Sequence, residues 1–152
     1  MGAVYMRILR AASMQDVLQA AILAALLWPD TSAVEHYETL MPLVAGGNGA
    51  VMMAMDEADM PIGFAQCALR RDYVEGTCTS PVGYLEGVYV MSTQRRQGVA
   101  RALVDACRAW AKEQGCTEFA SDCELDNDAS RAFHLAIGFA EANRIICFTQ
   151  KL

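Results

Sequence analysis

Apolar and polar positions alternate with two different periodicities along the first half of this chain of 152 residues. Apolar positions three and four residues apart are typical of a helix with one buried face, whereas short apolar runs between turn residues are typical of strands. The first half therefore predicts, in this order, a strand, two helices and two strands. They cover residues 5–9, 14–27, 33–43, 50–55 and 61–69.

Local chemistry indicates where these elements end. Ser13 is a candidate N-cap of the first helix, because its hydroxyl can accept a hydrogen bond from the first helical turn. Pro29 stops that helix, since proline cannot continue it. After the second of the two strands comes a polar loop over residues 70–81, which is too long for a tight hairpin. Loops of this length are usually functional or disordered.

The second half alternates strands and helices up to the end of the chain. The predicted elements are a strand over 83–90, a helix over 97–114, a strand over 118–122, a helix from Asp126 or Asn127 to Gly138, and a strand over 144–150. This order predicts a mixed α/β sheet with parallel neighbours at its centre, in a single domain over residues 1–152. The last strand is apolar through Ile145, Ile146 and Phe148, which fits a core strand and equally a strand that pairs across a subunit boundary.

The stretch from residue 84 to residue 101 reads as strand, polar loop and helix start. Glu86 and Gly87 interrupt the strand, and a glycine inside a strand often marks a bulge or a close backbone approach. The following loop ends in small residues, so free N–H groups at the helix start can bind a phosphate, which the helix dipole favours. The alternative is an ordinary strand-to-helix turn with a basic surface loop.

Two segments resemble a known superfamily. Arg95-x-x-Gly98-x-Ala100 after a strand resembles the acetyl-CoA loop of the GNAT N-acetyltransferases, and the segment from Asn127 to Phe139 resembles their second signature. The resemblance implies the acyl-CoA N-acyltransferase fold, an α/β (α+β mixed) structure with a splayed central sheet flanked by helices, and acetyl-CoA as co-substrate. The cofactor-binding residues that it implies are Val88, Tyr89, Val90, Arg95, Arg96, Gln97, Gly98, Val99, Ala100, Arg101, Asn127 and His134.

Other pieces of the chain are similar to the aminoglycoside 6'-N-acetyltransferases. The most specific are Asp-Tyr-Val-Glu-Gly at 72–76 and Leu-Glu-Gly at 85–87. This resemblance implies direct transfer of the acetyl group of acetyl-CoA to the 6'-amino group of aminoglycoside antibiotics, hence antibiotic resistance. It also implies a homodimer.

Acetyl transfer needs a neutral amine, donors for the oxyanion and a leaving thiolate. A primary ammonium is largely protonated at neutral pH, so a nearby carboxylate can take its proton, directly or through water. Glu86 is the candidate base, and the alternative is a solvated glutamate at a bulge. By the resemblance, the Val88 N–H faces the developing oxyanion.

His134 stands where many members of the superfamily have a tyrosine that is assigned as the acid for the leaving thiolate. Histidine can donate a proton near neutral pH. The alternative is a packed, hydrogen-bonded histidine beside Phe133, with water as the acid.

Three further side chains are candidates for contact with the substrate, as is Glu86. Asp122 ends a predicted strand, where ligands gather in parallel sheets, and it either pairs with substrate ammonium groups or caps a turn. The resemblance implies that Tyr73 contacts the sugar, across a dimer interface or within one chain, and the alternative is a surface aromatic. Trp28 either stacks on a sugar ring or belongs to the core.

Composition narrows the partners and the compartment. The net charge of −6 argues against a surface for nucleic acid or anionic lipid and is compatible with a cationic substrate. The apolar run over residues 20–28 is too short to span a membrane, and no convincing signal-peptide cleavage site follows it. Six cysteines without a Cys-x-x-Cys pair, and only two histidines, favour neither a disulfide scaffold nor a metal site. We expect a cytoplasmic protein without a metal.

Two other functions stay open at the level of the sequence. One is acetylation of another cationic amine, such as a polyamine or a lysine side chain, which the same acidic residues would serve. The other is a non-catalytic module that binds acyl-CoA or an aminoglycoside. An intact loop over residues 95–100 together with Glu86 argues against the second.

Overall fold

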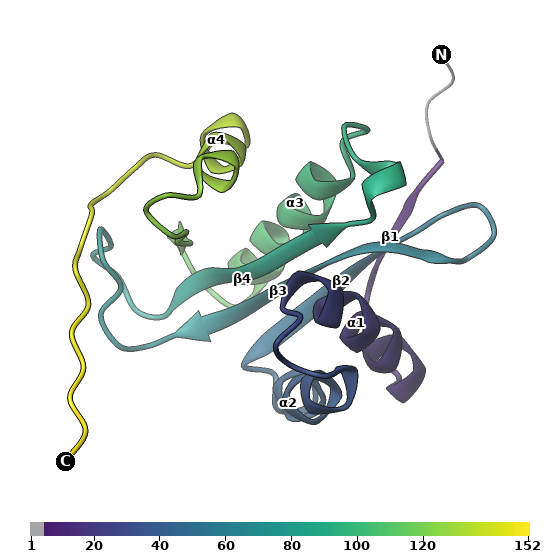
Figure 1. Cartoon of the computed structure of the whole chain (residues 1–152), viewed down its shortest axis with the longest axis horizontal. Coiled ribbons are helices and arrows are strands. Elements are labelled where there is room, and N and C mark those ends of the chain that lie inside the picture. The colour runs from purple at the N-terminus through teal and green to yellow at the C-terminus, as the bar shows by residue number, and fades with distance from the viewer. Residues whose placement is uncertain (1–4) are drawn as a thin grey trace.

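The computed structural model describes residues 5–152, in which helices cover both faces of one sheet (Figure 1). The strands are β1 (Arg7–Arg10), β2 (Gly49–Met55), β3 (Pro61–Arg70), β4 (Val82–Val90) and β5 (Phe119–Ala120), and they lie in that order across the sheet. β1 to β4 pair antiparallel, and β5 runs parallel to β4. The α-helices are α1 (Met14–Leu27), α2 (Ala33–Gly46), α3 (Val99–Glu113) and α4 (Asp128–Ala136), and a short 3-10 turn, η1 (Ser92–Gln94), precedes α3.

Capping boxes begin the first two helices. The Ser13 side chain accepts a hydrogen bond from the Asp16 N–H at 3.1 Å, and the Asp16 carboxylate accepts one from the Ser13 N–H at 3.0 Å. The N–H groups of Ala12 and Ser13 lower the pKa of Asp16, which keeps this carboxylate charged as an acceptor. Ser32 and Glu35 form the same arrangement before α2. The predicted N-cap and both predicted helices are confirmed, with α2 continuing to Gly46.

The interior strand β2 is buried along its whole length. Its odd-numbered residues from Val51 to Met55 pack with α1 and α2, and its even-numbered residues from Ala50 to Ala54 pack with α3. A strand that is covered on both faces needs apolar residues at every position. This explains the unbroken run Ala-Val-Met-Met-Ala-Met in the sequence. Figure 1 shows the same layers, with α1 and α2 on one side of the sheet and α3 on the other.

β4 and β5 separate almost as soon as they meet. They pair only at Gly83 with Phe119 and at Tyr84 with Ala120, so β5 is shorter than the predicted strand over 118–122. Among residues 5–152, no other strand covers the edge of β4 beyond Tyr84. The backbone groups along that edge are therefore available to a ligand.

The prediction of a last strand over residues 144–150 is wrong for the single chain. The segment after α4 forms no strand and runs along one side of the molecule as an extended tail (Figure 1). Ile145, Ile146 and Phe148 are 64%, 80% and 91% exposed. An apolar sequence of this kind becomes a strand only where a neighbour supplies hydrogen bonds and packing. No strand of the described chain reaches the tail.

Other boundaries shift only slightly. β1 begins at Arg7 and ends at Arg10, against a predicted strand over 5–9. α3 begins at Val99, because Gly98 takes a left-handed conformation with φ of 80°. The predicted start of α4 is confirmed, since the Asn127 side chain accepts a hydrogen bond from the Ser130 N–H at 3.0 Å. Within residues 5–152, no helix is both long and apolar enough to cross a membrane.

Candidate active site

The predicted interruption of β4 is a β-bulge. Gln66 of β3 pairs with Gly87, but the next residue, Cys67, pairs with Leu85. Glu86 is therefore the extra residue, which a bulge takes out of the regular alternation of side chains. Bulges re-aim side chains next to functional sites, and this one presents the candidate base in mid-strand.

Beyond the bulge, β4 directs backbone N–H groups to its open edge. On the β3 side, the Met91 N–H donates to the Ile62 carbonyl at 2.9 Å. On the other side, the Val90 carbonyl accepts a hydrogen bond from Arg95 Nε at 2.9 Å. Because successive peptide groups of a strand point to alternate sides, the N–H groups of Val88 and Val90 point to the open edge. This edge can bind an extended ligand by main-chain hydrogen bonds.

The loop after β4 leads into an open helix N-terminus. Arg96 and Gly98 both have left-handed backbones, with φ of 61° and 80°. Nothing lies within 4 Å of the position that a Cβ of Gly98 would occupy. The Ala102 N–H makes the first helical hydrogen bond, to the Gly98 carbonyl at 3.0 Å. The N–H groups of residues 98–101 precede that bond, and such groups at a helix N-terminus bind anions.

The other residues implied for the cofactor differ in their surroundings. Arg95 lies along β4, with its guanidinium carbon 5.6 Å from the centre of the Tyr89 ring. Arg96 and Gln97 are exposed, and Val99 is buried in the core. Arg101 donates to the Ala136 carbonyl at 2.7 Å, so in this structure it ties α3 to the end of α4.

Glu86 belongs to a series of four side chains in which each contacts the next. Arg70, the last residue of β3, donates from Nη2 to both carboxylate oxygens of Glu86 at 3.0 Å. Its guanidinium carbon lies 3.4 Å from the centre of the Tyr84 ring. The Tyr84 hydroxyl in turn donates to the Asp122 carboxylate. This series of contacts joins the two candidate carboxylates, Glu86 and Asp122, across the point where β4 and β5 separate.

Among these four side chains, Tyr84 is held in place by burial and by its hydrogen bond to Asp122. Burial of the ring and then the hydrogen bond to Asp122 raise the pKa of its phenol. A raised phenol pKa keeps the hydroxyl protonated at neutral pH, so it remains a donor to Asp122. Asp122 itself is exposed and therefore keeps oxygen atoms free for a further cationic partner.

Trp28 lies directly over the bulge. A Cβ on Gly87 would lie 2.5 Å from both Cζ2 and Cη2 of the Trp28 ring, so only glycine leaves room for the indole. The ring also packs near Phe64 and His36, at centroid distances of 6.2 and 5.6 Å. Trp28 is only partly buried. It therefore packs on the core with part of its surface and borders the site with the rest.

His134 is both packed and hydrogen-bonded. Its Nδ1 lies 2.7 Å from the Ser130 carbonyl, which can only accept, so Nδ1 carries a proton. Its Nε2 lies 2.8 Å from Ser121 Oγ, and that oxygen lies 3.1 Å from the Leu85 carbonyl. The rings of Phe133 and Phe139 flank the imidazole. The histidine thus reaches the opening between β4 and β5 through the Ser121 hydroxyl.

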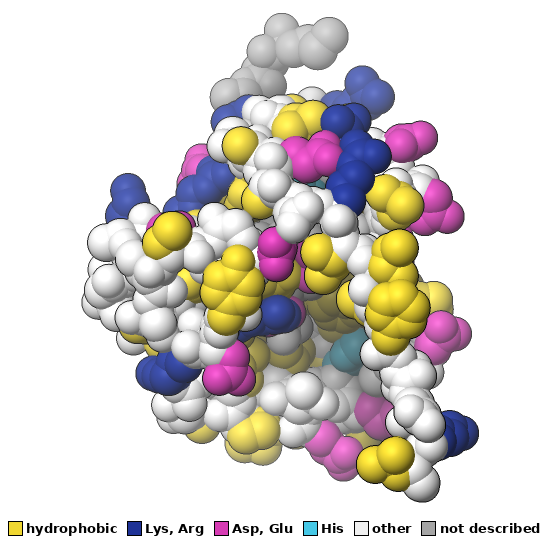
Figure 2. Space-filling view, turned by 90° about the vertical axis from the view of Figure 1, so that its left-hand side faces the viewer, with side chains coloured by type: hydrophobic (Ala, Val, Ile, Leu, Met, Phe, Trp, Pro, Cys, Tyr) yellow, Lys and Arg dark blue, Asp and Glu magenta, His cyan; other side chains and the backbone are white. Residues whose placement is uncertain are grey.

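Tyr73 is a surface aromatic in the single chain. It belongs to the loop between β3 and β4 and is 76% exposed. Figure 2 shows the side of the molecule that carries this loop and the tail. Acidic, basic and histidine side chains border a hollow on that side.

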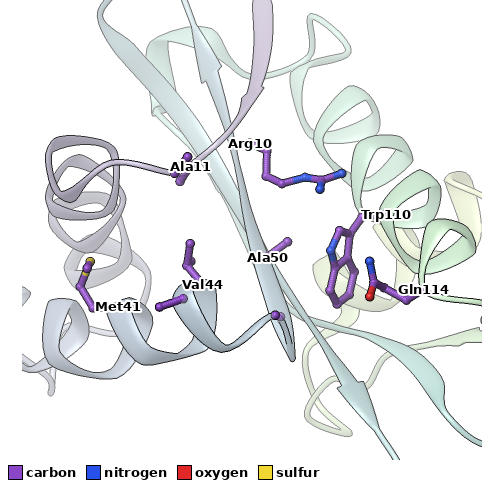
Figure 3. Close-up of a pocket in the computed structure, with 11 residues that line it drawn as sticks. Arg10, Ala11, Met41, Val44, Ala50, Trp110 and Gln114 are labelled. Atoms are coloured by element: carbon purple, nitrogen blue, oxygen red, sulfur yellow. The ribbon is translucent and has the colours of Figure 1, made fainter.

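A separate cavity of about 360 Å³ lies on the β1 and β2 side of the sheet, away from the edge of β4 (Figure 3). Arg10, Ala50, Trp110 and Gln114 are among the residues that line it. Its lining residues come mainly from α2, β1, β2 and the C-terminal end of α3, and none of them is a candidate site residue. The cavity is therefore not part of the candidate site. Within residues 5–152, no three His, Cys, Asp or Glu side chains are grouped as metal ligands would be.

Sequence reasoning missed three residues of this site: Arg70, Tyr84 and Ser121. Arg70 reads as the start of a polar loop, and Tyr84 reads as one more apolar strand residue. Ser121 directly follows β5, so the rule that ligands gather at the carboxyl ends of parallel strands could have indicated it. For the other two, the partners lie far away in the sequence, and no local signal marks them.

The profile of the acetyltransferase (GNAT) family matches residues 16–139 of this chain. The chain belongs to this family, and the expected fold is confirmed.

Within the family, the chain is similar to aminoglycoside N(6')-acetyltransferases of type 1. It is 40% identical to the protein of that name from Acinetobacter baumannii over 86% of this chain and 88% of that protein. It is 41% identical to the one from Stenotrophomonas maltophilia over 95% and 93% of the two chains.

Solved structures agree with these relatives. The structure of AAC(6')-Ih from Acinetobacter baumannii matches with a TM-score of 0.90 and 37% identity over 97% of this chain and 99% of that one. AAC(6')-Iy in complex with the bisubstrate analogue CoA-S-monomethyl-acetylneamine matches with a TM-score of 0.91 and 32% identity, also over 97% and 99%.

The close contact of Trp28 with Gly87 leads to a first prediction. In Gly87→Ala the new methyl group must displace the indole or the bulge beside Glu86. Displacing active-site groups by about 1 Å can cost about 10²-fold in rate, so we expect kcat/KM to fall on the order of 10–100-fold in an acetyl-transfer assay. Tryptophan fluorescence should change as well, because Trp28 is one of two tryptophans.

The control for this substitution is Gly46→Ala. No atom lies within 4 Å of the Cβ position at Gly46, so this variant should keep the activity and fluorescence of the original protein. Normal kcat/KM and emission in Gly87→Ala would contradict the close packing of Trp28 on β4.

Proposed function

We propose that this protein transfers the acetyl group of acetyl-CoA directly to the 6'-amino group of aminoglycoside antibiotics, and so confers resistance to them. One observation carries this proposal. Where β4 and β5 separate, Glu86 and Asp122 lie beside the open edge of β4. Aminoglycosides are polycationic, and two carboxylates joined through Arg70 and Tyr84 suit such a substrate. Similarity to N(6')-acetyltransferases over most of both chains supports the same reaction.

The cofactor is held by main-chain groups. The N–H groups of residues 98–101 bind the pyrophosphate of acetyl-CoA, with Arg95, Arg96 and Gln97 contributing from the loop and Arg101 from the first turn of α3. The open edge at Val88 and Val90 binds the pantetheine arm, which places the thioester beside the bulge. Tyr89 lies between these donors, and Asn127 borders the arm from the start of α4.

The reaction then proceeds by direct attack. Glu86 takes a proton from the 6'-ammonium, directly or through water, and the free amine attacks the thioester carbonyl. The Val88 N–H donates to the oxyanion that forms. As the C–S bond breaks, the attacking nitrogen loses its second proton to water, and the CoA thiolate takes a proton from protonated His134 through Ser121, or from water. Asp122, Trp28 and Tyr73 hold the rings and the other ammonium groups of the drug.

We further propose a homodimer in which the tails of two chains pair. The support is the exposure of the apolar tail residues Ile145, Ile146 and Phe148. Monomeric proteins rarely expose contiguous apolar segments, and such segments usually mark contact surfaces. The tail has the composition of a strand but no neighbouring strand in its own chain. The tail of a second copy of the protein can supply the missing hydrogen bonds and packing.

We also propose that residues 1–152 work as one domain in the cytoplasm. All six cysteines are free thiols, and Cys78, Cys123 and Cys147 are exposed. Exposed thiols persist in a reducing compartment and pair readily outside one.

The proposed activity is tested by thiol release from acetyl-CoA with a panel of amines. We expect release with aminoglycosides that carry a 6'-amino group and none with analogues that carry a 6'-hydroxyl group, because only the amine can attack the thioester. Spermidine and a lysine-containing peptide belong to the same panel. Preferred release with either of them would assign another amine, and acetyl-CoA binding without any release would indicate a non-catalytic module.

The role of Glu86 is tested by Glu86→Gln. Loss of a general base typically costs roughly 10²–10⁴-fold in rate, so kcat should fall by that amount while the KM for acetyl-CoA stays close to its original value. Glu113→Gln is the matched control, because Glu113 is also paired with an arginine, Arg10 at 2.7 Å, but lies away from the site. A kcat unchanged across the pH range in Glu86→Gln would exclude Glu86 as the base.

The proposed dimer is tested by sedimentation. One chain has a mass of 16.5 kDa, so sedimentation of a dimer should give a molecular mass of twice that value, about 33 kDa. The double variant Ile146→Asn, Phe148→Ser should sediment as a monomer, because polar side chains remove the apolar contact. Leu152→Ser, at the equally exposed chain end, is the control and should remain dimeric. Sedimentation of the unchanged protein at 16.5 kDa would exclude the dimer.

A further inference from the structure

Arg70 already occupies the place of a cation in the candidate substrate site. It donates to Glu86 from two nitrogens, with Nε at 3.2 Å from Oε1 and Nη2 at 3.0 Å from both oxygens. A guanidinium bound in this forked manner engages the carboxylate oxygens that an attacking ammonium needs. Arg70 therefore competes with a substrate ammonium for the oxygen atoms of Glu86.

The guanidinium is held on its flat side as well. Its carbon lies 3.4 Å from the centre of the Tyr84 ring, which is a stacked cation–π geometry. The Tyr84 hydroxyl holds Asp122, so Arg70 sits between the two carboxylates of the site and faces one of them directly. A cationic substrate that binds both Glu86 and Asp122 therefore encounters the positive charge of this arginine.

The position of Arg70 is one from which it can move. Its side chain is 42% exposed, whereas that of Glu86 is 26% exposed. Ion pairs with one well-exposed partner contribute little to stability, so their exchange for another cation costs little. The arginine can swing into solvent and leave a largely covered carboxylate behind, which a new cation can then neutralise.

We propose that Arg70 is an internal placeholder for the substrate ammonium: it neutralises and orients Glu86 in the free enzyme and is displaced when the aminoglycoside binds. This inference rests on the proposed function, because it concerns how the same site receives its substrate. Arg70 is a positioning residue, since it acts through Glu86 and does not take part in the bonds that form and break.

The proposal has a consequence that distinguishes it from a structural role. A placeholder competes with the substrate, so its removal should tighten binding of the aminoglycoside. We expect Arg70→Gln to lower the dissociation constant for neamine, a 6'-amino aminoglycoside, by roughly two- to fivefold, which is the range that exposed ion pairs supply. The KM for neamine should fall with it, and kcat and the affinity for acetyl-CoA should stay within roughly twofold.

Two further variants sharpen the measurement. Arg71→Gln removes the same charge from the neighbouring residue, whose guanidinium donates to Asn48 at 3.2 Å instead of Glu86. It should leave the neamine affinity unchanged. Arg70→Lys keeps the charge but loses the fork and the stacking, so its affinity should lie between those of the original protein and Arg70→Gln.

Isothermal titration of all four proteins with neamine, and separately with acetyl-CoA, separates the outcomes. Equal or weaker neamine binding by Arg70→Gln would overturn the placeholder role, as would equal tightening by Arg71→Gln, which would indicate a general charge effect. A protein with its original Arg70 that binds acetyl-CoA but no aminoglycoside would refute the proposed function, and the placeholder role with it.

Discussion

The early separation of β4 from β5 is the constraint on which the rest of this structure depends. Two residue pairs join the strands, and beyond Tyr84 the edge of β4 stays open. In most proteins an open edge invites unwanted pairing, and it is covered or kept short. Here the opening is bordered by His134 and Ser121 on one side and by the helix N-terminus at Gly98 beyond the end of β4. The same gap therefore leaves room for an extended cofactor, whose reactive end we propose lies at the bulge.

The carboxylates of the site are paired with polar partners near the surface rather than buried. Charges buried without partners are costly, and none of the buried residues in the described chain is charged. Glu86 is shielded by an arginine that remains partly in water, and Asp122 is held by a phenol whose raised pKa keeps it protonated. Carboxylates held in this way have partners and still lie within reach of solvent.

Much of the fold could be predicted because its signals are local. Ser13 and Pro29 delimit α1, and the spacing of apolar residues in α3 describes a face that packs on the sheet. The bulge at Glu86 and Gly87 could be predicted as well, since a glycine inside an apolar strand usually marks a bulge or a close backbone approach. The tail was predicted wrongly, because the sequence of residues 144–150 has the composition of a strand whether or not a neighbour is present to pair with it.

The sequence by itself determined the family, the four helices and every strand but the one predicted over 144–150, and it indicated the candidate loop over residues 95–100 and the two candidate carboxylates. Three contacts were decided only by the tertiary structure. Arg70 donates hydrogen bonds to Glu86, and Tyr84 donates one to Asp122. Trp28 packs on Gly87. These pairs join β3 to β4, β4 to the residues after β5, and α1 to β4. Contacts between distant segments depend on how the sheet and helices pack in three dimensions, and no local pattern of residues encodes them.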